Sequence, residues 1–234
     1  RTTVATTAAP ATAAATAAAT AAATTQPVTV SDSRQRFGIG VGLPAPWVKR
    51  LTDLKAGWFL DWSALSPSGH PAGLEYARMV RVPRGKPVPD LATLAATAPR
   101  SPGALWLIGN EPDVIWQDNA TPEQYANVYH DVYATLKQAD PMSRIAIAGV
   151  SQPTPLRLRY LDRVLAVYQQ QFGTAMPVDV WNVHNFILPE KRGDWGVDIP
   201  PGLDAVSGLI VEVEDHDDLA RFKQQIVDFR RWMA

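Results

Sequence analysis

The stretch Ala104-Leu-Trp-Leu-Ile-Gly-Asn-Glu-Pro-Asp113 decides the fold. Its first half is an almost unbroken apolar run, which is typical of a β-strand that is buried on both faces. Pro112 lacks a backbone N–H and therefore ends the hydrogen-bond ladder of the strand. The stretch predicts a buried strand of a parallel sheet, with Asn110 and Glu111 at its carboxyl end.

On both sides of this strand the sequence alternates between further strands and helices. We predict strands over residues 37–43, 57–62, 76–82, 104–109, 145–150 and 178–186. We predict helices over residues 46–56, 89–98, 156–172 and 217–233, and one more that begins at Thr121 with a capping box completed by Gln124. Repeated strand–helix units of this kind imply an α/β fold with a parallel sheet.

Two α/β architectures have this order of elements, the doubly wound open sheet and the (β/α)₈ TIM barrel. The doubly wound sheet is disfavoured because no glycine-rich phosphate loop follows the first strand, where Gly38, Gly40 and Gly42 lie within the strand itself. We therefore expect a TIM barrel, truncated to about six βα units. Catalytic side chains of such barrels project from the carboxyl ends of the strands.

Composition and charge exclude several classes of protein. The 234 residues carry a net charge of −1, which does not indicate a nucleic-acid partner, and no apolar run is long enough for a transmembrane segment. The absence of cysteine excludes disulfides and cysteine-ligated zinc, and the four histidines lack the spacing of a helical metal pair. We expect neither a metal nor a cofactor, and no pattern predicts an oligomeric state.

The amino-terminal residues differ from the rest of the chain. The first 25 residues hold 13 alanines and 9 threonines and only one charge, so they lack the apolar face that a core requires. We predict that residues 1–33 are a disordered Ala/Thr-rich linker and that residues 34–234 are a partial barrel domain. Because such tracts resemble extracellular stalks, we expect an extracellular or cell-surface location, and because the chain begins with Arg1 we expect a fragment or a processed piece.

Glu111 is the strongest candidate for chemistry. It lies at the end of the fourth predicted strand, near Trp106 and Trp116. Apolar surroundings favour the neutral form of a carboxylic acid, which is the form that a general acid needs. The simpler interpretation is a loop residue that caps a turn or pairs with a surface cation. The position at a strand end favours the catalytic role.

Three segments resemble a known group of enzymes. Gly109-Asn-Glu-Pro-Asp113 resembles the acid/base motif of the retaining glycoside hydrolases of clan A, which have a (β/α)₈ barrel. Ala56-Gly-Trp-Phe-Leu-Asp-Trp62 resembles the second strand of the β-glucanases known as the glycosyl hydrolase catalytic core group. Val178-Asp-Val-Trp-Asn-Val-His-Asn-Phe186 is similar to the sixth strand of the clan. The resemblance covers residues 36–234.

The resemblance implies roles for individual residues. Glu111 corresponds to the general acid/base, and Asn110 to the residue that hydrogen-bonds the 2-hydroxyl of the sugar. The residues that would line the site or stack on sugar at its rim are His184, Asn182, Trp62, Trp116 and Gln152. A structural role in packing or hydrogen bonding is the alternative for each of these five residues.

The nucleophile of the resembled enzymes is a second glutamate at the end of the seventh strand. Retaining glycosidases need two carboxyl groups about 5–5.5 Å apart. The last predicted element is the helix over 217–233, so we expect the nucleophile to be missing from this chain and the chain alone to be inactive. Glu212 and Glu214 follow the sixth strand too closely for a seventh strand and are predicted to lie in a loop, and Asp61 is expected to orient a neighbour.

The sequence thus leads to one principal hypothesis and two alternatives. The principal hypothesis is a retaining glycoside hydrolase that acts on a β-linked polysaccharide or oligosaccharide, with carbohydrate as its partner. The first alternative is a carbohydrate-binding barrel without catalysis. The second is a structural or adhesion domain on a stalk, in which Glu111 has no chemical role.

Overall fold

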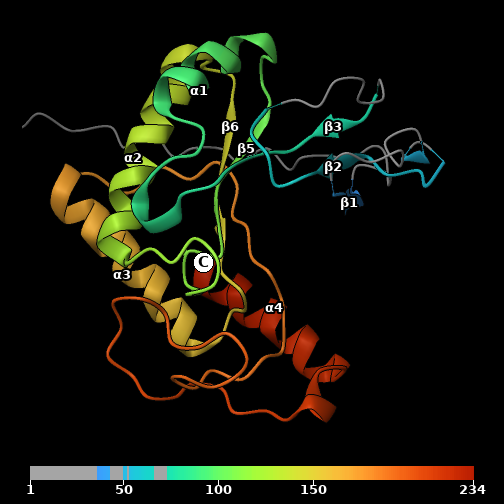
Figure 1. The fold of residues 1–234 in the computed structure, drawn as a ribbon, viewed down its shortest axis with the longest axis vertical. Coiled ribbons are helices and arrows are strands. Elements are labelled where there is room, and N and C mark those ends of the chain that lie inside the picture. Colours follow the sequence, from blue (N-terminus) through green and yellow to red (C-terminus); the bar gives the residue numbers. More distant parts are fainter. Residues whose placement is uncertain (1–35, 43–49, 52, 66–72) are drawn as a thin grey trace, which may run out of the picture. The chain divides into compact units, whose positions relative to one another are not determined.

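Short parallel strands alternate with helices along the chain (Figure 1). The computed structural model describes residues 36–42, 50–51, 53–65 and 73–234. The strands are β1 (Gly38–Gly40), β2 (Trp58–Leu60), β3 (Glu75–Tyr76), β4 (Arg78–Val80), β5 (Leu105–Asn110) and β6 (Arg144–Gly149). The α-helices are α1 (Leu91–Thr97), α2 (Pro122–Ala139), α3 (Pro155–Phe172) and α4 (Leu219–Met233). The predicted linker 1–33 and most of the predicted helix 46–56 lie outside the described residues.

The strands pair in the order in which they follow one another in the sequence. β1, β2 and β3 form one parallel sheet, and β4, β5 and β6 form another. Only Ala77 separates β3 from β4. Within residues 75–80, the first two pair with β2 and the last three pair with β5. The order shows no reversal, in contrast to a doubly wound sheet, where the strand order reverses at the ligand site.

The predicted sixth strand is present only as a segment with two isolated parallel bridges. Val180 pairs with Ala146, and Val183 pairs with Val150, beyond the end of β6. The Asp179 side chain accepts a hydrogen bond from the Ile145 N–H at 2.9 Å, and the pairing does not extend into a regular ladder. In the described part of the chain the strands do not close into a barrel.

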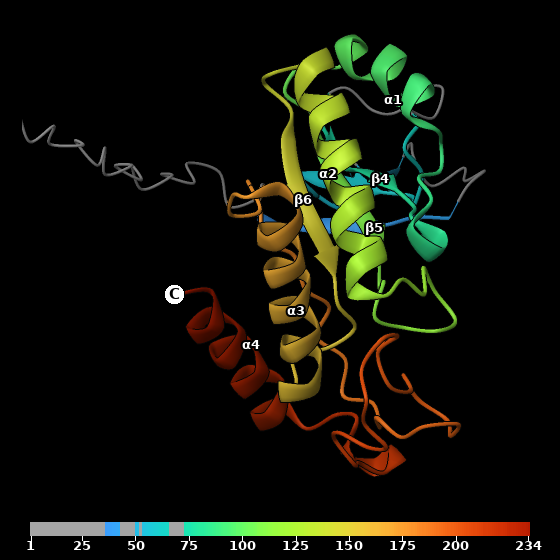
Figure 2. The same cartoon turned by 90° about the vertical axis from the view of Figure 1, so that its left-hand side faces the viewer.

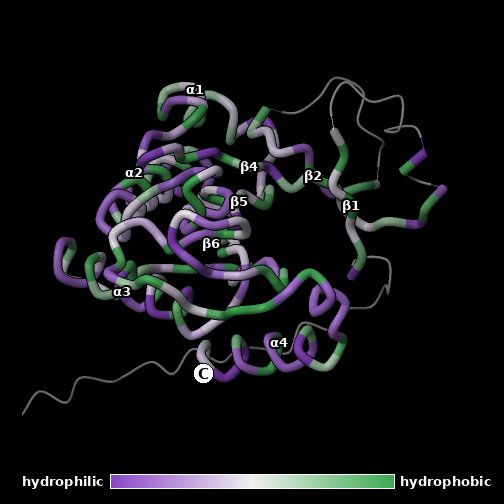
Figure 3. The backbone as a smooth tube through the Cα atoms, turned by 60° about the horizontal axis from the view of Figure 1, so that its bottom comes forward, coloured by the Kyte–Doolittle hydropathy of each residue, from purple (hydrophilic) through white to green (hydrophobic). Residues whose placement is uncertain are grey.

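Helices α1, α2 and α3 cover one face of the β4–β5–β6 sheet (Figures 1 and 2). Two tyrosines of α2, Tyr125 and Tyr129, are fully buried in this layer, together with Trp106 and Ile108 of β5. The buried residues of α2 recur at intervals of three and four positions, namely Tyr125, Val128, Tyr129, Val132 and Leu136. This spacing is the pattern of a helix that packs one face on a sheet. α4 alternates between hydrophilic and hydrophobic residues (Figure 3), and it buries Phe229 in the same core.

The ends of the helices confirm the predicted capping signals. The Thr121 hydroxyl accepts from the Gln124 N–H, and the Gln124 side chain accepts from the Thr121 N–H, so the capping box is complete. α3 ends at Gly173, whose φ of 71° is the left-handed conformation that glycine adopts readily. Glu212 and Glu214 lie in a loop with one 3₁₀ turn, as expected, and Asp218 caps α4.

Replacement of the α2 cap tests this account of the fold. Thr121→Ala removes one partner of the capping box, so we expect the free energy of unfolding to fall by about 1 kcal/mol. Chemical denaturation followed by circular dichroism measures the change. The control is Thr135→Ala, because the Thr135 hydroxyl donates to a carbonyl inside the same helix and its loss leaves no N–H unpaired. Equal losses in the two variants would contradict the assignment.

Candidate active site

The carboxyl end of β5 is held in a special backbone conformation. Gly109 has a φ of 97°, which residues with a side chain rarely adopt. The β5–β6 register accordingly omits the pair that Gly109 would make with Ala148. The Tyr125 hydroxyl takes its place: it donates to the Ile108 carbonyl and accepts from the Ala148 N–H, both at 2.7 Å. Burial raises the pKa of Tyr125, which keeps its proton on this bridge.

Glu111 lies directly after this bend and has a left-handed φ of 45°. Such a conformation costs a residue with a side chain about 1 kcal/mol or more and persists only where the surroundings enforce it. The Glu111 N–H donates to the Gly149 carbonyl at 3.1 Å, and its own carbonyl accepts from the Val114 N–H. The residue is only 8% exposed. Two neighbouring strand ends thus fix the backbone of the candidate acid.

The Glu111 carboxylate meets the imidazole of His184. Its Oε1 lies 2.5 Å from His184 Nδ1, which is hydrogen-bonding distance. His184 comes from the bridged segment beside β6, where its N–H donates to the Val150 carbonyl at 2.9 Å. The structure therefore brings together two of the residues that the sequence singled out, 73 positions apart.

Asp118, a residue that we did not predict from the sequence, holds the turn that follows Glu111. Its Oδ2 accepts from the Asn110 N–H at 2.7 Å and from the Val82 N–H at 3.0 Å. Its Oδ1 forms an ion pair with Arg81 at 2.7 Å. One buried carboxylate therefore ties the end of β5 to the chain just beyond β4.

A second polar network lies under the same turn. The guanidinium of Arg157, fully buried on α3, forms ion pairs with Asp113 at 2.7 Å and with Glu190 at 3.0 Å. It also donates to the carbonyls of Val197 and Asp198. The sequence carried one signal for this network, because Arg157 falls on the apolar face of its predicted helix, and a cation there requires buried partners.

Asn182 and His184 occupy space that a side chain on β6 would fill. A Cβ atom at Gly149 would lie 2.8 Å from His184 Cδ2 and 3.1 Å from Asn182 Nδ2. Gly149 is the last residue of β6, so the strand end leaves room for both side chains. We did not predict this role of Gly149 from the sequence, although a glycine at the end of an apolar strand is a sign of close approach.

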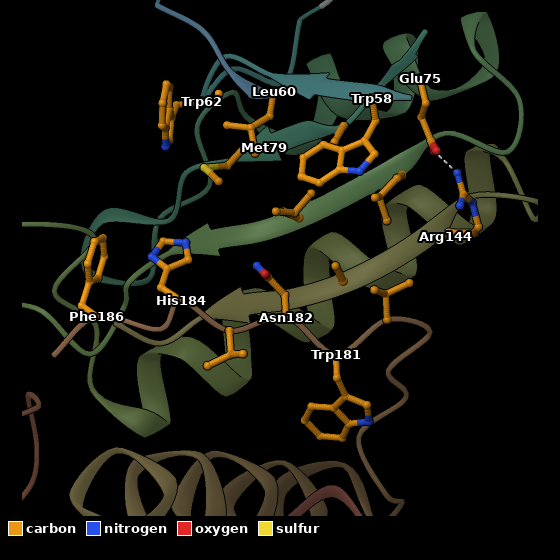
Figure 4. Close-up of a pocket in the computed structure, with 17 residues that line it drawn as sticks. Trp58, Leu60, Trp62, Glu75, Met79, Arg144, Trp181, Asn182, His184 and Phe186 are labelled. Atoms are coloured by element: carbon orange, nitrogen blue, oxygen red, sulfur yellow. Dashed lines mark hydrogen bonds and ion pairs between the residues drawn. The ribbon is translucent and has the colours of Figure 1, made fainter. Parts of the chain in front are cut away.

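A pocket of about 640 Å³ opens on the face of the sheets opposite the helices (Figure 4). His184, Asn182 and Phe186 lie on one side, and Trp62, Leu60, Trp58 and Met79 lie on the other (Figure 4). The Glu75–Arg144 ion pair lies at the far end, beside the amino ends of the strands. The lining is largely apolar and aromatic with a few polar groups, and neither Glu111 nor Asn110 belongs to it, so His184 is the residue that joins the candidate acid to the pocket.

Two buried polar atoms near the pocket have no partner among the described residues. They are Asn110 Oδ1 and Asn182 Nδ2. The Asn110 amide uses its nitrogen to donate to Gln117 at 3.2 Å. Because an unpaired buried polar atom costs about 1–3 kcal/mol, these two atoms distinguish Asn110 and Asn182 from side chains with a purely structural role.

The remaining predicted site residues lie in different settings. Trp62 lines the pocket and is half exposed. Trp116 is exposed and lies outside the pocket wall, with its indole N–H donating to the Gly196 carbonyl at 3.2 Å. Gln152 is buried, and its amide bonds both the N–H and the carbonyl of Leu188, so it supports the segment after His184 instead of lining the pocket.

In the described part of the chain, no group of three or more His, Cys, Asp or Glu side chains is arranged to hold a metal ion. None of the helices described combines the length and the apolar character needed to cross a lipid bilayer.

Consecutive parallel strands that alternate with helices define an α/β fold. No protein-family model matches the sequence, and no curated protein is similar to it. Solved structures of β-1,3-glucanases from family GH128 share the fold. The resemblance to glycoside hydrolases is thus confirmed at the level of fold.

Three of these enzymes illustrate the likeness. A curdlan-specific exo-β-1,3-glucanase of subgroup III from Blastomyces gilchristii is 21% identical, with a TM-score of 0.53 over 83% of this chain and 70% of its own. Endo-β-1,3-glucanases of subgroup II from Pseudomonas viridiflava and Sorangium cellulosum are 18% and 19% identical, each with a TM-score of 0.50. This chain aligns with 62% and 67% of its residues, and spans 58% and 63% of theirs.

The space at Gly149 can be tested directly. We expect Gly149→Ala to displace the His184 ring, because the new methyl group would lie 2.8 Å from it. The imidazole nitrogen signals in an NMR spectrum should then change as the contact with Glu111 is lost, while the protein stays folded because a side-chain tip can move. Gly42→Ala is the control, since a Cβ atom there meets nothing within 4 Å. An unchanged imidazole spectrum in Gly149→Ala would refute the proposed packing.

Proposed function

We propose that the chain forms the acid/base half of a retaining glycoside hydrolase active site in a (β/α)₈-type barrel, with a β-linked glucan as substrate. The contact between Glu111 and His184 at the strand ends is the observation that carries this proposal. The fold likeness to β-1,3-glucanases supports a β-1,3-glucan in particular. The consecutive parallel strand order supports the barrel.

In this proposal Glu111 acts twice. It first donates a proton to the glycosidic oxygen while a carboxylate nucleophile attacks the anomeric carbon and the leaving sugar departs. It then accepts a proton from the water that hydrolyses the glycosyl–enzyme bond, which restores the starting state. His184 fixes the orientation of the Glu111 carboxyl group through the 2.5 Å contact.

The other residues of the candidate site bind sugar in this proposal or support residues that do. Asn110 and Asn182 provide the free acceptor and the free donor for sugar hydroxyls, with Asn110 directed at the 2-hydroxyl. Trp62 stacks on a sugar ring at the pocket rim, where its indole is half exposed. Gln152 positions the His184 segment through its two bonds to Leu188.

We further propose that the nucleophile is not among the residues of this chain and that the chain alone does not hydrolyse glycosides. Each of the other buried carboxylates in the described part accepts bonds from arginine, backbone N–H or hydroxyl groups: Asp61, Asp113, Asp118, Asp140, Glu190 and Asp198. Asp61 alone keeps a carboxylate oxygen without a partner, Oδ2, while its Oδ1 accepts from the Tyr76 hydroxyl at 2.6 Å and orients that side chain. The Ala/Thr-rich residues 1–33 support an extracellular or cell-surface setting.

A second candidate function is oligosaccharide binding without hydrolysis. The observation that favours it is that Glu75, the one carboxylate among the described residues that line the pocket, is paired with Arg144, because a binding module needs the pocket but no nucleophile. Both functions predict that β-1,3-glucan oligosaccharides bind. Only the enzyme predicts that Glu111 controls the release of sugar.

Replacement of Glu111 separates the two functions. In the full-length protein we expect Glu111→Gln to lower the release of reducing ends from a soluble β-1,3-glucan by about 10²–10⁴-fold, because the amide can neither donate nor accept the transferred proton. The affinity for laminaripentaose, measured by calorimetry, should change little because the side chain keeps its size.

Glu214→Gln, on an exposed loop residue, is the control and should leave both properties unchanged. Full hydrolytic activity in Glu111→Gln would refute the catalytic assignment. Binding without hydrolysis in the wild-type protein would favour the binding module. The absence of both would refute a carbohydrate function.

A further inference from the structure

Two buried tyrosines of α2 use their hydroxyl groups differently. Tyr129 donates one hydrogen bond, to the Pro177 carbonyl at 2.8 Å. Tyr125 donates to the Ile108 carbonyl of β5 and also accepts from the Ala148 N–H of β6, both at 2.7 Å. A phenyl ring would fill the same space in the core without a polar group, and burial of a polar group is costly unless it is bonded. The Tyr125 hydroxyl therefore calls for an explanation other than packing.

The hydroxyl lies where β5 changes the direction of its backbone groups. In a regular parallel strand, every second residue turns its N–H and its carbonyl toward the same neighbouring strand. The Ile108 carbonyl faces β6, so regular geometry would turn the Asn110 N–H toward β6 as well. That N–H instead donates to Asp118, and the Glu111 N–H reaches β6, at the Gly149 carbonyl. The strand is therefore out of step by one residue when it reaches the candidate acid.

Tyr125 touches this shift in two ways. Its hydroxyl binds the Ile108 carbonyl, which directly precedes Gly109, and the Ala148 N–H on the neighbouring strand. Its ring packs on Gly109 itself, where a Cβ atom would lie 3.2 Å from Tyr125 Cε2. Gly109 has the positive φ of 97° that the shift requires. One side chain from α2 thus holds both the glycine and the backbone groups beside it.

The carboxyl group of Glu111 is sensitive to this geometry. Glu111 follows Gly109 by two residues and has a φ of 45°, a conformation that the surroundings must enforce. Its Oε1 lies 2.5 Å from His184 Nδ1, and hydrogen bonds weaken steeply when their distance and angle change. Relaxation of β5 toward a regular strand would turn the Glu111 N–H away from the Gly149 carbonyl and move the carboxyl group from the imidazole.

We propose that Tyr125 is a positioning residue for Glu111, which keeps the end of β5 out of step and so holds the carboxyl group against His184. The catalytic consequence of this inference rests on the proposed function, whereas the placement of the carboxyl group does not. Tyr125 does not line the pocket. It acts through the backbone of Ile108 and Gly109.

The test removes the hydroxyl and keeps the ring. Tyr125→Phe deprives the Ile108 carbonyl and the Ala148 N–H of their shared partner, so these two groups pair directly and β5 relaxes toward a regular strand. We expect the imidazole nitrogen signals of His184 in an NMR spectrum to shift toward their positions in Glu111→Ala, where the carboxyl group is absent. Circular dichroism checks the fold. Tyr125→Met, whose flexible side chain fills the space of the ring, replaces Tyr125→Phe if the latter does not fold.

The kinetics of the full-length protein give a second readout. We expect Tyr125→Phe to lower kcat on a soluble β-1,3-glucan by up to about 10²-fold, which is the effect of a small misplacement of a catalytic group. KM should stay unchanged, because Tyr125 does not line the pocket.

Tyr129→Phe is the matched control. It also removes a buried hydroxyl from α2 and leaves one carbonyl, that of Pro177, without its partner. Chemical denaturation should show a loss of stability in both variants. Only Tyr125→Phe should change the His184 signals and kcat, which separates a positioning role from a structural one.

Two results would overturn the positioning role. Unchanged His184 signals in folded Tyr125→Phe would leave the tyrosine with a structural role alone. Equal shifts in Tyr125→Phe and Tyr129→Phe would show that any lost bond in this layer reaches the site.

The spectrum requires neither sugar nor hydrolysis, so failure of the proposed function is distinguishable. If the wild-type protein does not hydrolyse β-1,3-glucan and the His184 signals still shift in Tyr125→Phe, the proposed function is refuted and the placement of the carboxyl group stands. If the wild-type protein hydrolyses the glucan and Tyr125→Phe has the same kcat, the catalytic consequence is refuted and the proposed function stands.

Discussion

The carboxyl end of the sheet depends on the two ion pairs of one buried side chain, the guanidinium of Arg157. Its side chain is inaccessible to solvent, and it joins the turn after β5, through Asp113, to the long loop before α4, through Glu190. Removal of one partner from such a buried group costs about 3–5 kcal/mol because a charge remains uncompensated. The network therefore fixes two loops that would otherwise move independently.

Strain at the end of β5 is tolerated because these anchors surround it. Gly109 and Glu111 both have positive φ values, and Asp118 and Tyr125 take up the backbone groups that the bend leaves without ladder partners. The result is a carboxylate that projects toward His184 instead of continuing along the strand. Backbone strain at this position is consistent with a functional site, where surrounding structure enforces conformations that are otherwise rare.

The local elements of the fold could be predicted from the sequence. The apolar run of β5 and the capping box of α2 are signals between neighbouring residues, and the structure has both elements at the expected positions. The predicted strand over 178–186 lacks a regular ladder, because the Asp179 side chain takes the Ile145 N–H that a strand would bond through a backbone carbonyl. Strand propensity does not reveal that a side-chain carboxylate, instead of a backbone carbonyl, accepts the hydrogen bond from the Ile145 N–H.

The candidate site was predictable in part for a similar reason. The sequence marks Glu111 and Asn110 by their place at a strand end, and the structure has both residues at the end of β5, whereas Asp118 and Arg157 act through partners that are distant in sequence. Gln152 illustrates the reverse case. Its place after a strand suggested contact with sugar, but its amide is engaged by the backbone of Leu188. Only the packing of two segments 36 positions apart reveals that engagement.

The central claim is that the pocket beside Glu111 and His184 binds a β-1,3-glucan. The most direct measurement is an NMR titration of the isotopically labelled protein with laminaritriose, with signals assigned to individual residues. The account predicts that the largest changes occur at the Trp62 indole, the His184 imidazole and the Asn110 and Asn182 amides. Changes confined to other surfaces, or no change at millimolar sugar, would contradict it.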